Sequence, residues 1–252
     1  VSPGPALDGQ SRALADAAPG RVAFGIGTSS NVIVERWNDI PFEEPYKKTR
    51  DMVRFLRTAL TGEKVKADYD TFSVNGFKLS AVPQQQPKIL IAALRQGMLR
   101  LAGAEGDGAI VNWLGADDVA TVATFVHEGG DDKEVVARIF VAPTTDAALV
   151  RDWGRRLIAA YLTVPVYAEF HRWMGRGELL QPMWDAWAAG DRAGALEHIP
   201  DDLVDTLIVH GSPEACREHI GRYQANGITT PALAVLPFGV DQRQAIRDLA
   251  PR

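Results

Sequence analysis

Short apolar runs of strand length alternate with helix-like segments along most of this 252-residue chain. Each run is bounded by Gly, Pro or small polar residues, which is typical of strands buried in a parallel sheet. We predict strands over residues 22–26, 88–93, 107–111, 135–141 and 231–236. Strands that alternate with helices pair in parallel through right-handed crossovers. The sequence therefore predicts an α/β fold with about five parallel strands.

The helix predictions depend on apolar periodicity and on residues that start or stop helices. Ser212-Pro213 is a strong helix start, Asp146 follows two threonines that favour a cap, and Asn226-Gly227 is a typical helix stop. The predicted helices cover residues 5–18, 45–61, 98–105, 116–127, 144–162, 200–207, 213–226 and 241–249.

Three segments interrupt this alternation. Residues 31–45 hold two aromatics and two prolines and predict a long packed loop. Residues 68–80 alternate around Asn75-Gly76, which predicts a hairpin that decorates the main sheet. Residues 164–200 contain three tryptophans and predict a helical insertion. We expect all of these in one domain over residues 1–252.

Composition excludes several classes of protein. The formal net charge of −5 argues against a nucleic-acid partner, and no apolar run is long enough to predict a membrane span. The start of the chain lacks a signal-peptide pattern, and Cys216 is a single cysteine, so we expect a cytoplasmic protein. No two of the five histidines have metal-ligand spacing, so we predict no metal site.

The first predicted strand ends in a glycine- and hydroxyl-rich stretch, residues 20–30. We expect residues 22–26 to be buried on both faces, with Gly25 and Gly27 leaving room for a ligand or a tight turn. Thr28, Ser29 and Ser30 follow, at the strand end that carries the chemistry in parallel α/β folds. The stretch lacks the third glycine of a dinucleotide fingerprint. A strand end with packing glycines is an equally good interpretation of the motif alone.

The second predicted strand leads into a turn with arginine and glycine before a helix. Its residues are Ala93, Leu94, Arg95, Gln96, Gly97 and Met98. A helix N-terminus binds anions well, because its backbone N–H groups are unpaired and its dipole is positive. The alternative is an ordinary turn with a surface arginine.

Several motifs resemble one family when they are taken in order. Residues 20–28 (GRVAFGIGT) resemble the S/P-G-G-R-x-x-L-G-I-G-T segment of the bacterial luciferase-like monooxygenases. Residues 89–94 with 98–108, and the helix start at 211–214, resemble its I-x-V-A-A-x…A-G-x-x-A-D-G and G-T/S-P-E segments. Residues 34–38 and 41–43 look like the actinobacterial branch that uses the deazaflavin coenzyme F420.

The resemblance implies a luciferase-like (β/α)8 TIM barrel. In that family residues 22–26 match the fourth strand, so this chain apparently lacks the first three βα units. Five strands cannot close a barrel, and two sheet edges would then be open. The chain would then be a fragment of a longer protein, or something else would cover the edge.

The resemblance also implies a cofactor site and its chemistry. The cofactor-binding residues would be Thr28, Ser29, Ser30, Ala93, Leu94, Arg95, Gln96, Gly97 and Met98. Asn112, Trp113 and Phe238 end later strands and would line the substrate pocket, although Trp113 fits a core aromatic equally well. Glu35 is a weak candidate for a catalytic acid or base, and a solvated loop residue is the better interpretation of it.

We therefore predict an F420-dependent oxidoreductase that transfers a hydride between the deazaflavin and a small organic substrate. The alternatives are an FMN-dependent luciferase-like monooxygenase and a non-catalytic remnant of the fold. The tryptophan-rich insertion suggests an apolar substrate. We also expect a homodimer, since relatives are often dimers.

Overall fold

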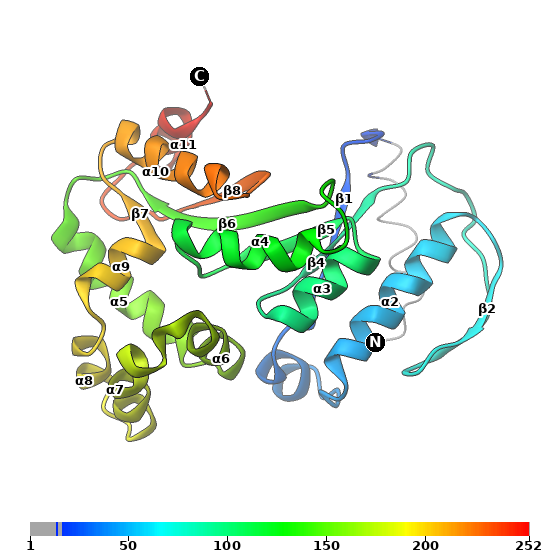
Figure 1. Ribbon diagram of the computed structural model, residues 1–252, viewed down its shortest axis with the longest axis horizontal. Helices are drawn as coiled ribbons and strands as arrows, with labels where there is room; N and C mark the ends of the chain where they lie inside the picture. Colours follow the sequence, from blue (N-terminus) through cyan, green and yellow to red (C-terminus); the bar gives the residue numbers. More distant parts are fainter. Residues whose placement is uncertain (1–13, 15–16, 252) are drawn as a thin grey trace. The chain divides into compact units, whose positions relative to one another are not determined.

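A computed structural model describes residue 14 and residues 17–251, and these form two compact units (Figure 1). Unit 1 comprises the described residues up to residue 110 together with residues 125–134, and unit 2 comprises residues 111–124 and 135–251. The helix predicted over residues 5–18 lies almost wholly outside the described residues.

Unit 1 contains three parallel strands, β1 (Ala23–Ile26), β4 (Lys88–Ala92) and the first part of β5 (Gly108–Asn112). β4 pairs with β1 and with β5, and the register places Ile26 beside Ile91 and Ile91 beside Ala109. The carboxyl ends of these strands therefore lie along one edge of the sheet. All three strands were predicted, with bounds that differ by one residue or two.

The burial of β1 corrects one expectation. Its residues alternate between exposed and half-buried, and none is buried on both faces. The physical reason is its position: among the described residues β1 pairs with β4 alone, so one face and one edge lack the partners that bury a central strand.

Helices α2 (Pro45–Leu60) and α3 (Gln96–Glu105) pack against each other in unit 1. α2 starts at the predicted Pro45 and buries an apolar face that includes Val53, Phe55 and Leu56. Arg57 pairs with Asp107 at 2.8 Å, which connects α2 to the segment before β5. The predicted loop of residues 31–45 is partly wrong, because it contains the π-helix η1 (Val32–Trp37).

The hairpin is present, but its turn is not at Asn75-Gly76. Strand β2 (Val65–Asp68) pairs antiparallel with β3 (Ser73–Phe77), and Gly76 sits within β3 at a register shift. Its φ of +86° suits a glycine bulge. The turn is at residues 69–72 because the buried Asp51 carboxylate accepts hydrogen bonds from both the N–H and the hydroxyl of Thr71.

Unit 2 has a parallel sheet with a long central strand. β6 (Glu134–Ala142) pairs with β8 (Thr230–Val235) along most of its length and with the short β7 (Ile208–His210) at its carboxyl end. β6 and β8 were predicted, whereas β7 was not. The β8 register places Val235 beside Val141, so these two strands end together.

Helices cover the rest of unit 2, including residues 164–200, where a helical insertion was predicted. They are η2 (Ala116–Asp118), α4 (Val119–His127, whose last turn belongs to unit 1), α5 (Ala147–Leu162), α6 (Pro165–His171), η3 (Arg172–Arg176), α7 (Gly177–Ala188), α8 (Arg192–Glu197), α9 (Asp201–Leu207), α10 (Pro213–Ala225) and α11 (Gln242–Leu249). Asp146 and Ser212 cap α5 and α10 through their side chains, as predicted. A large apolar core forms among α5 to α9, with Ile158, Leu180 and Met183 fully buried.

Candidate functional site

The two turns predicted to bind a cofactor lie on the same edge of the unit 1 sheet. β1 and β4 are adjacent and parallel, so the turn after Ile26 and the turn after Ala92 leave that edge together. Gly27 makes the close approach possible, because a Cβ on it would lie 2.9 Å from the Cβ of Ala92. The structure thus brings residues 28–30 and residues 93–98 to one place.

The turn after β4 presents the start of α3. Arg95 is the N-cap residue, with extended backbone angles (φ −121°, ψ 167°), and Gln96 and Gly97 are exposed. The first N–H groups of a helix have no partner within it. A Cβ on Gly97 would meet no atom within 4 Å, so the space beside these amides is open. The helix start therefore offers unpaired donors, a positive dipole end and room for an anion.

The remaining residues of that turn shape it. Ala93 is buried, and its N–H donates to the Ile110 carbonyl at 2.9 Å. Leu94 and Met98 are half-buried. These contacts fix the path of the chain into α3.

The turn after β1 is strained and polar. Ser29 has a φ of +59°, which is uncommon for a residue other than glycine. The Thr28 hydroxyl donates to the Ser29 carbonyl at 3.1 Å, and the Ser30 carbonyl accepts from Val34 N–H at 2.9 Å at the start of η1. Thr28 and Ser29 keep hydroxyl lone pairs for a ligand, whereas Ser30 helps to form η1.

Glu35 lies on η1 and is exposed. Its carboxylate accepts a hydrogen bond from Phe42 N–H at 3.4 Å and so holds the loop of residues 38–44 against η1. This contact gives Glu35 a role in the loop, and a catalytic role for it stays a prediction.

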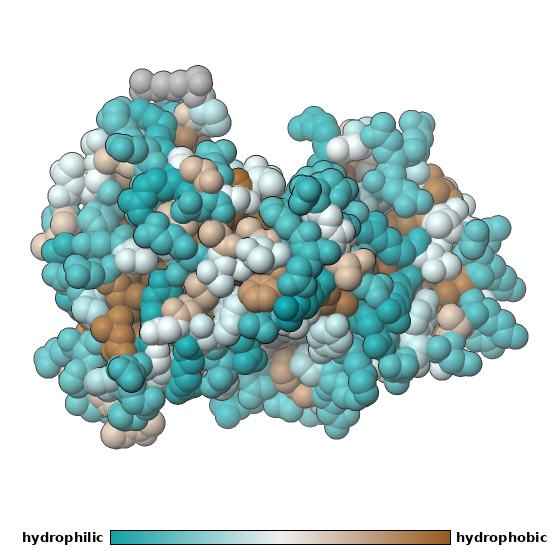
Figure 2. Space-filling view, viewed as in Figure 1, coloured by the Kyte–Doolittle hydropathy of each residue, from teal (hydrophilic) through white to brown (hydrophobic). Residues whose placement is uncertain are grey.

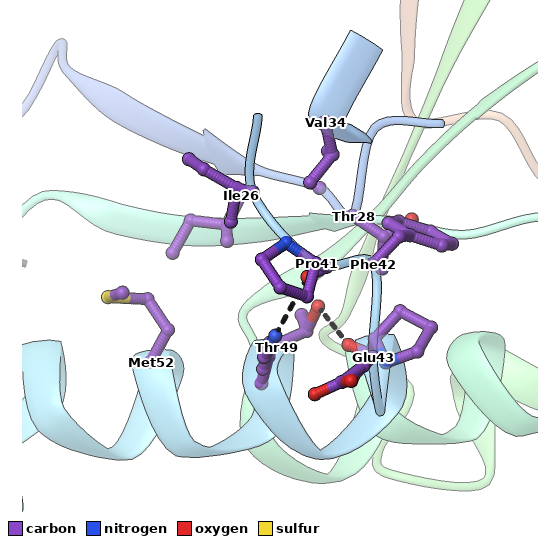
Figure 3. Close-up of a pocket in the computed structure, with 12 residues that line it drawn as sticks. Ile26, Thr28, Val34, Pro41, Phe42, Glu43, Thr49 and Met52 are labelled. Atoms are coloured by element: carbon purple, nitrogen blue, oxygen red, sulfur yellow. Dashed lines mark hydrogen bonds between the residues drawn. The ribbon is translucent and has the colours of Figure 1, made fainter. Parts of the chain in front are cut away.

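A cavity opens beneath this loop, between the end of β1, η1 and the start of α2 (Figure 3). Its volume is about 210 Å³. The apolar residues that line it are Ile26, Val34, Ile40, Pro41, Phe42, Pro45 and Met52. Gly27 and Thr28 also line it, so the cavity borders the turn after β1. Sequence reasoning missed this cavity, although the aromatic- and proline-rich pattern of residues 37–45 was the available signal.

The predicted substrate residues Asn112, Trp113 and Phe238 all belong to unit 2. Asn112 is half-buried, and its amide donates to the Tyr167 hydroxyl at 3.4 Å. Phe238 is partly buried and stacks on Trp153 with 6.2 Å between ring centroids. Nothing further tests their role, which stays a prediction.

Trp113 lies in the core of unit 2, with 1% of its surface exposed. Its ring packs on Phe140 and Tyr161, with centroids 4.3 and 4.9 Å away, and its φ is +55°. Its indole N–H has no acceptor among the described residues. The placement fits a core aromatic in a strained turn.

A mostly buried ion pair lies next to this turn. Arg176 donates to both carboxylate oxygens of Asp118 at 2.8 Å, and Asp118 also accepts from Gly115 N–H at 2.7 Å. His171 is fully buried nearby, and this burial, together with the Arg176 cation, lowers its pKa to about 3. His171 is therefore neutral at pH 7, with one of its two ring nitrogens protonated. Sequence spacing gave no signal for this cluster.

Cys216 is buried in α10, where burial raises the pKa of its thiol to about 11, so the thiol is unreactive at neutral pH. No three His, Cys, Asp or Glu residues gather as metal ligands in the described part of the chain. Within residues 17–251, none of the helices has both the length and the apolar character to cross a bilayer. Figure 2 shows a largely polar face with small apolar patches. The predicted homodimer and cytoplasmic location stay predictions.

The structure is a parallel α/β fold in which two turns meet at the carboxyl ends of neighbouring strands. The family model described as luciferase-like monooxygenase matches residues 9–230, and the chain belongs to this family. The recognised resemblance is thereby confirmed.

Similar proteins include two curated relatives. The chain is 28% identical to 5,10-methylenetetrahydromethanopterin reductase of Archaeoglobus fulgidus, over 90% of this chain and 71% of that protein. It is 24% identical to F420-dependent glucose-6-phosphate dehydrogenase of Mycolicibacterium smegmatis, over 93% of this chain and 70% of that protein.

Among solved structures, the coenzyme F420-dependent tetrahydromethanopterin reductase of Methanopyrus kandleri has a similar fold. The TM-score is 0.74 at 19% identity, over 94% of this chain and 75% of that one. The α/β fold class is therefore confirmed. Whether the chain lacks three βα units stays a prediction.

Proposed function

We propose that this chain binds coenzyme F420 along the carboxyl edge of β1 and β4, and transfers a hydride between it and a small organic substrate. The observation that carries the proposal is the adjacency of the two turns: the hydroxyl-bearing turn after β1 lies beside the helix start after β4. Relatives that carry F420 in their names support the choice of cofactor.

The residues present fit a cofactor with a phosphate. The amides of Gln96, Gly97 and Met98 would hold the phosphate, because a helix start supplies unpaired donors and a positive dipole. The open space beside Gly97 leaves room for it. Thr28 and Ser29 would accept or donate hydrogen bonds at the polar edge of the ring system.

When bound, a deazaflavin supplies a carbon that accepts or donates a hydride but does not activate oxygen as a flavin does. The chain's own residues bind the phosphate and orient the ring against the substrate. They use backbone amides and hydroxyls, which have no charge to change between pH 5 and pH 8, so the binding contacts hold across that range.

An FMN-dependent monooxygenase is the second candidate, favoured by the description of the family model. Equilibrium titration followed by cofactor fluorescence separates the two: the proposal predicts saturable binding of F420 that is tighter than that of FMN. Tighter FMN binding supports the monooxygenase. Binding of neither supports a non-catalytic remnant of the fold.

A further inference from the structure

The cavity beneath the loop of residues 38–44 borders the turn after β1, and none of the residues that line it belongs to the helix start proposed to hold the phosphate. It is lined on one side by Ile26 and Thr28 and on the other by Met52 and Thr49 of α2, and Phe42 lies at the loop side (Figure 3). A cavity of about 150 Å³ lined by aliphatic and aromatic side chains holds a benzene molecule. At about 210 Å³, this one has room for a single ring or a branched alkyl group.

The charges around the cavity do not suit an anionic ligand. Lys48 and Glu43 are the charged residues among those that line it, and their formal charges cancel. The Lys48 ammonium already donates to the Pro41 carbonyl at 3.2 Å. No arginine lines the cavity, whereas phosphate and carboxylate groups are commonly bound by the arginine fork.

The loop over the cavity holds unusual backbone. Asp39 and Glu44 have left-handed backbone, with φ values of +53° and +45°. Among the described non-glycine residues, the others with positive φ are Ser29 and Trp113. η1 is a π-helix, a form that is frequent at functional sites. Strained residues persist where surrounding contacts hold them, and they cluster at ligand sites.

We infer that this cavity binds an uncharged, apolar part of the substrate, a single ring or a branched alkyl group. The inference rests on the proposed function, because Thr28 belongs both to the cavity wall and to the proposed cofactor turn. Transfer of an apolar group from water to this lining makes the binding free energy more favourable in proportion to the apolar area that becomes buried. A sugar phosphate would instead place its charge against apolar walls, where Lys48 is already bonded to the Pro41 carbonyl and no arginine lines the cavity.

Methionine methyl groups give a direct test, because the chain has four methionines. Met52 lines the cavity, Met98 lies in the first turn of α3, and Met183 is buried in the unit 2 core. Isotope-labelled methionine methyls are followed by NMR while cyclohexanone, glucose 6-phosphate or F420 is added to the full chain. Met52→Leu identifies the Met52 signal by its loss.

We expect cyclohexanone to shift the Met52 signal saturably, with a dissociation constant of about 1 mM, as is ordinary for so small a probe. Glucose 6-phosphate is expected to leave it unmoved. Val34→Phe fills the cavity and should raise the dissociation constant for cyclohexanone about tenfold, because the probe loses one well-packed apolar contact. Ile33→Phe is the matched control, since Ile33 is exposed and does not line the cavity. Unshifted Met183 signals show that both variants fold.

The two proposals fail separately. F420 shifts Met98 if the proposed function holds. A Met52 signal that does not respond to cyclohexanone, or that responds equally in the Val34→Phe variant, overturns the cavity assignment while Met98 still reports the cofactor. A Met98 signal unmoved by F420 removes the proposed function and, with it, the assignment of the cavity's ligand as a substrate.

Discussion

Gln96→Glu should move stability and cofactor affinity in opposite directions. Gln96 is the first residue of α3 and is exposed. Glutamate has nearly the same shape as glutamine, so the change adds one negative charge and little else. That charge stands at the positive end of the helix, which favours it, and beside the proposed phosphate, which it repels.

Both effects can be estimated. An anion in the first turn of a helix stabilises it by about 0.3–1 kcal/mol. Two like charges about 4 Å apart repel by about 1 kcal/mol in bulk water and by more near a protein surface. A cost of about 1–2 kcal/mol corresponds to roughly 5–30-fold weaker binding of F420. The loss should shrink as salt screens the repulsion.

The assay pairs urea unfolding with F420 fluorescence titration at low and high salt. Gln242→Glu is the matched control, because Gln242 is the exposed first residue of α11. It places the same charge at another helix start and should leave F420 binding unchanged. Equal affinity for the wild type and the Gln96→Glu variant, or an equal loss in both variants, would refute the proposed anion site.

Three further predictions concern stability. Arg176→Met should cost about 3 kcal/mol in urea unfolding, because it leaves the Asp118 carboxylate mostly buried and unpaired; a loss under 1 kcal/mol contradicts this. The pKa of His171 is about 3 in the folded protein, against an ordinary value of 6.5. Its contribution to the free energy of unfolding is therefore fully present above pH 6.5 and is lost as the pH falls toward 3, by about 1.4 kcal/mol per pH unit. His171→Leu should flatten that slope, and an unchanged slope counts against burial as its cause. In thermal unfolding, Gly27→Ala should destabilise the protein by about 1–3 kcal/mol, because its added Cβ clashes with β4. Gly97→Ala has open space around it and should stabilise the protein by up to about 1 kcal/mol through α3. A Gly27→Ala variant that is more stable than the Gly97→Ala variant would contradict both predictions.

Local signals in the sequence predicted the elements that local physics determines. Asp146 and Ser212 cap their helices through side-chain hydrogen bonds to Leu149 and Ala215. The parallel strands followed from their alternation with helices. The same logic placed the turns after β1 and β4 at one edge, since parallel neighbours end together.

Contacts between distant residues determined what the sequence left open. The hairpin turn is fixed by Asp51, which lies 20 residues before Thr71 and binds it. β7 has only three residues, too few for a periodic signal. The Arg176–Asp118 pair joins residues 58 positions apart, and no local pattern announces it.

The candidate site divides in the same way. The helix start after β4 was predicted because glycine and arginine follow a strand, although α3 begins at Gln96, two residues before the predicted Met98. The cavity could not be predicted from the sequence, because its wall combines the end of β1 with Thr49 and Met52 of α2. These α2 residues look like ordinary core positions until the helix is packed.

A crystal structure of the chain with F420 tests the central claim most directly. The account predicts phosphate oxygens about 3 Å from the amides of Gln96, Gly97 and Met98, at ordinary hydrogen-bond distance. It also predicts the ring system beside Thr28. A phosphate bound elsewhere, with these amides facing solvent, would contradict the account.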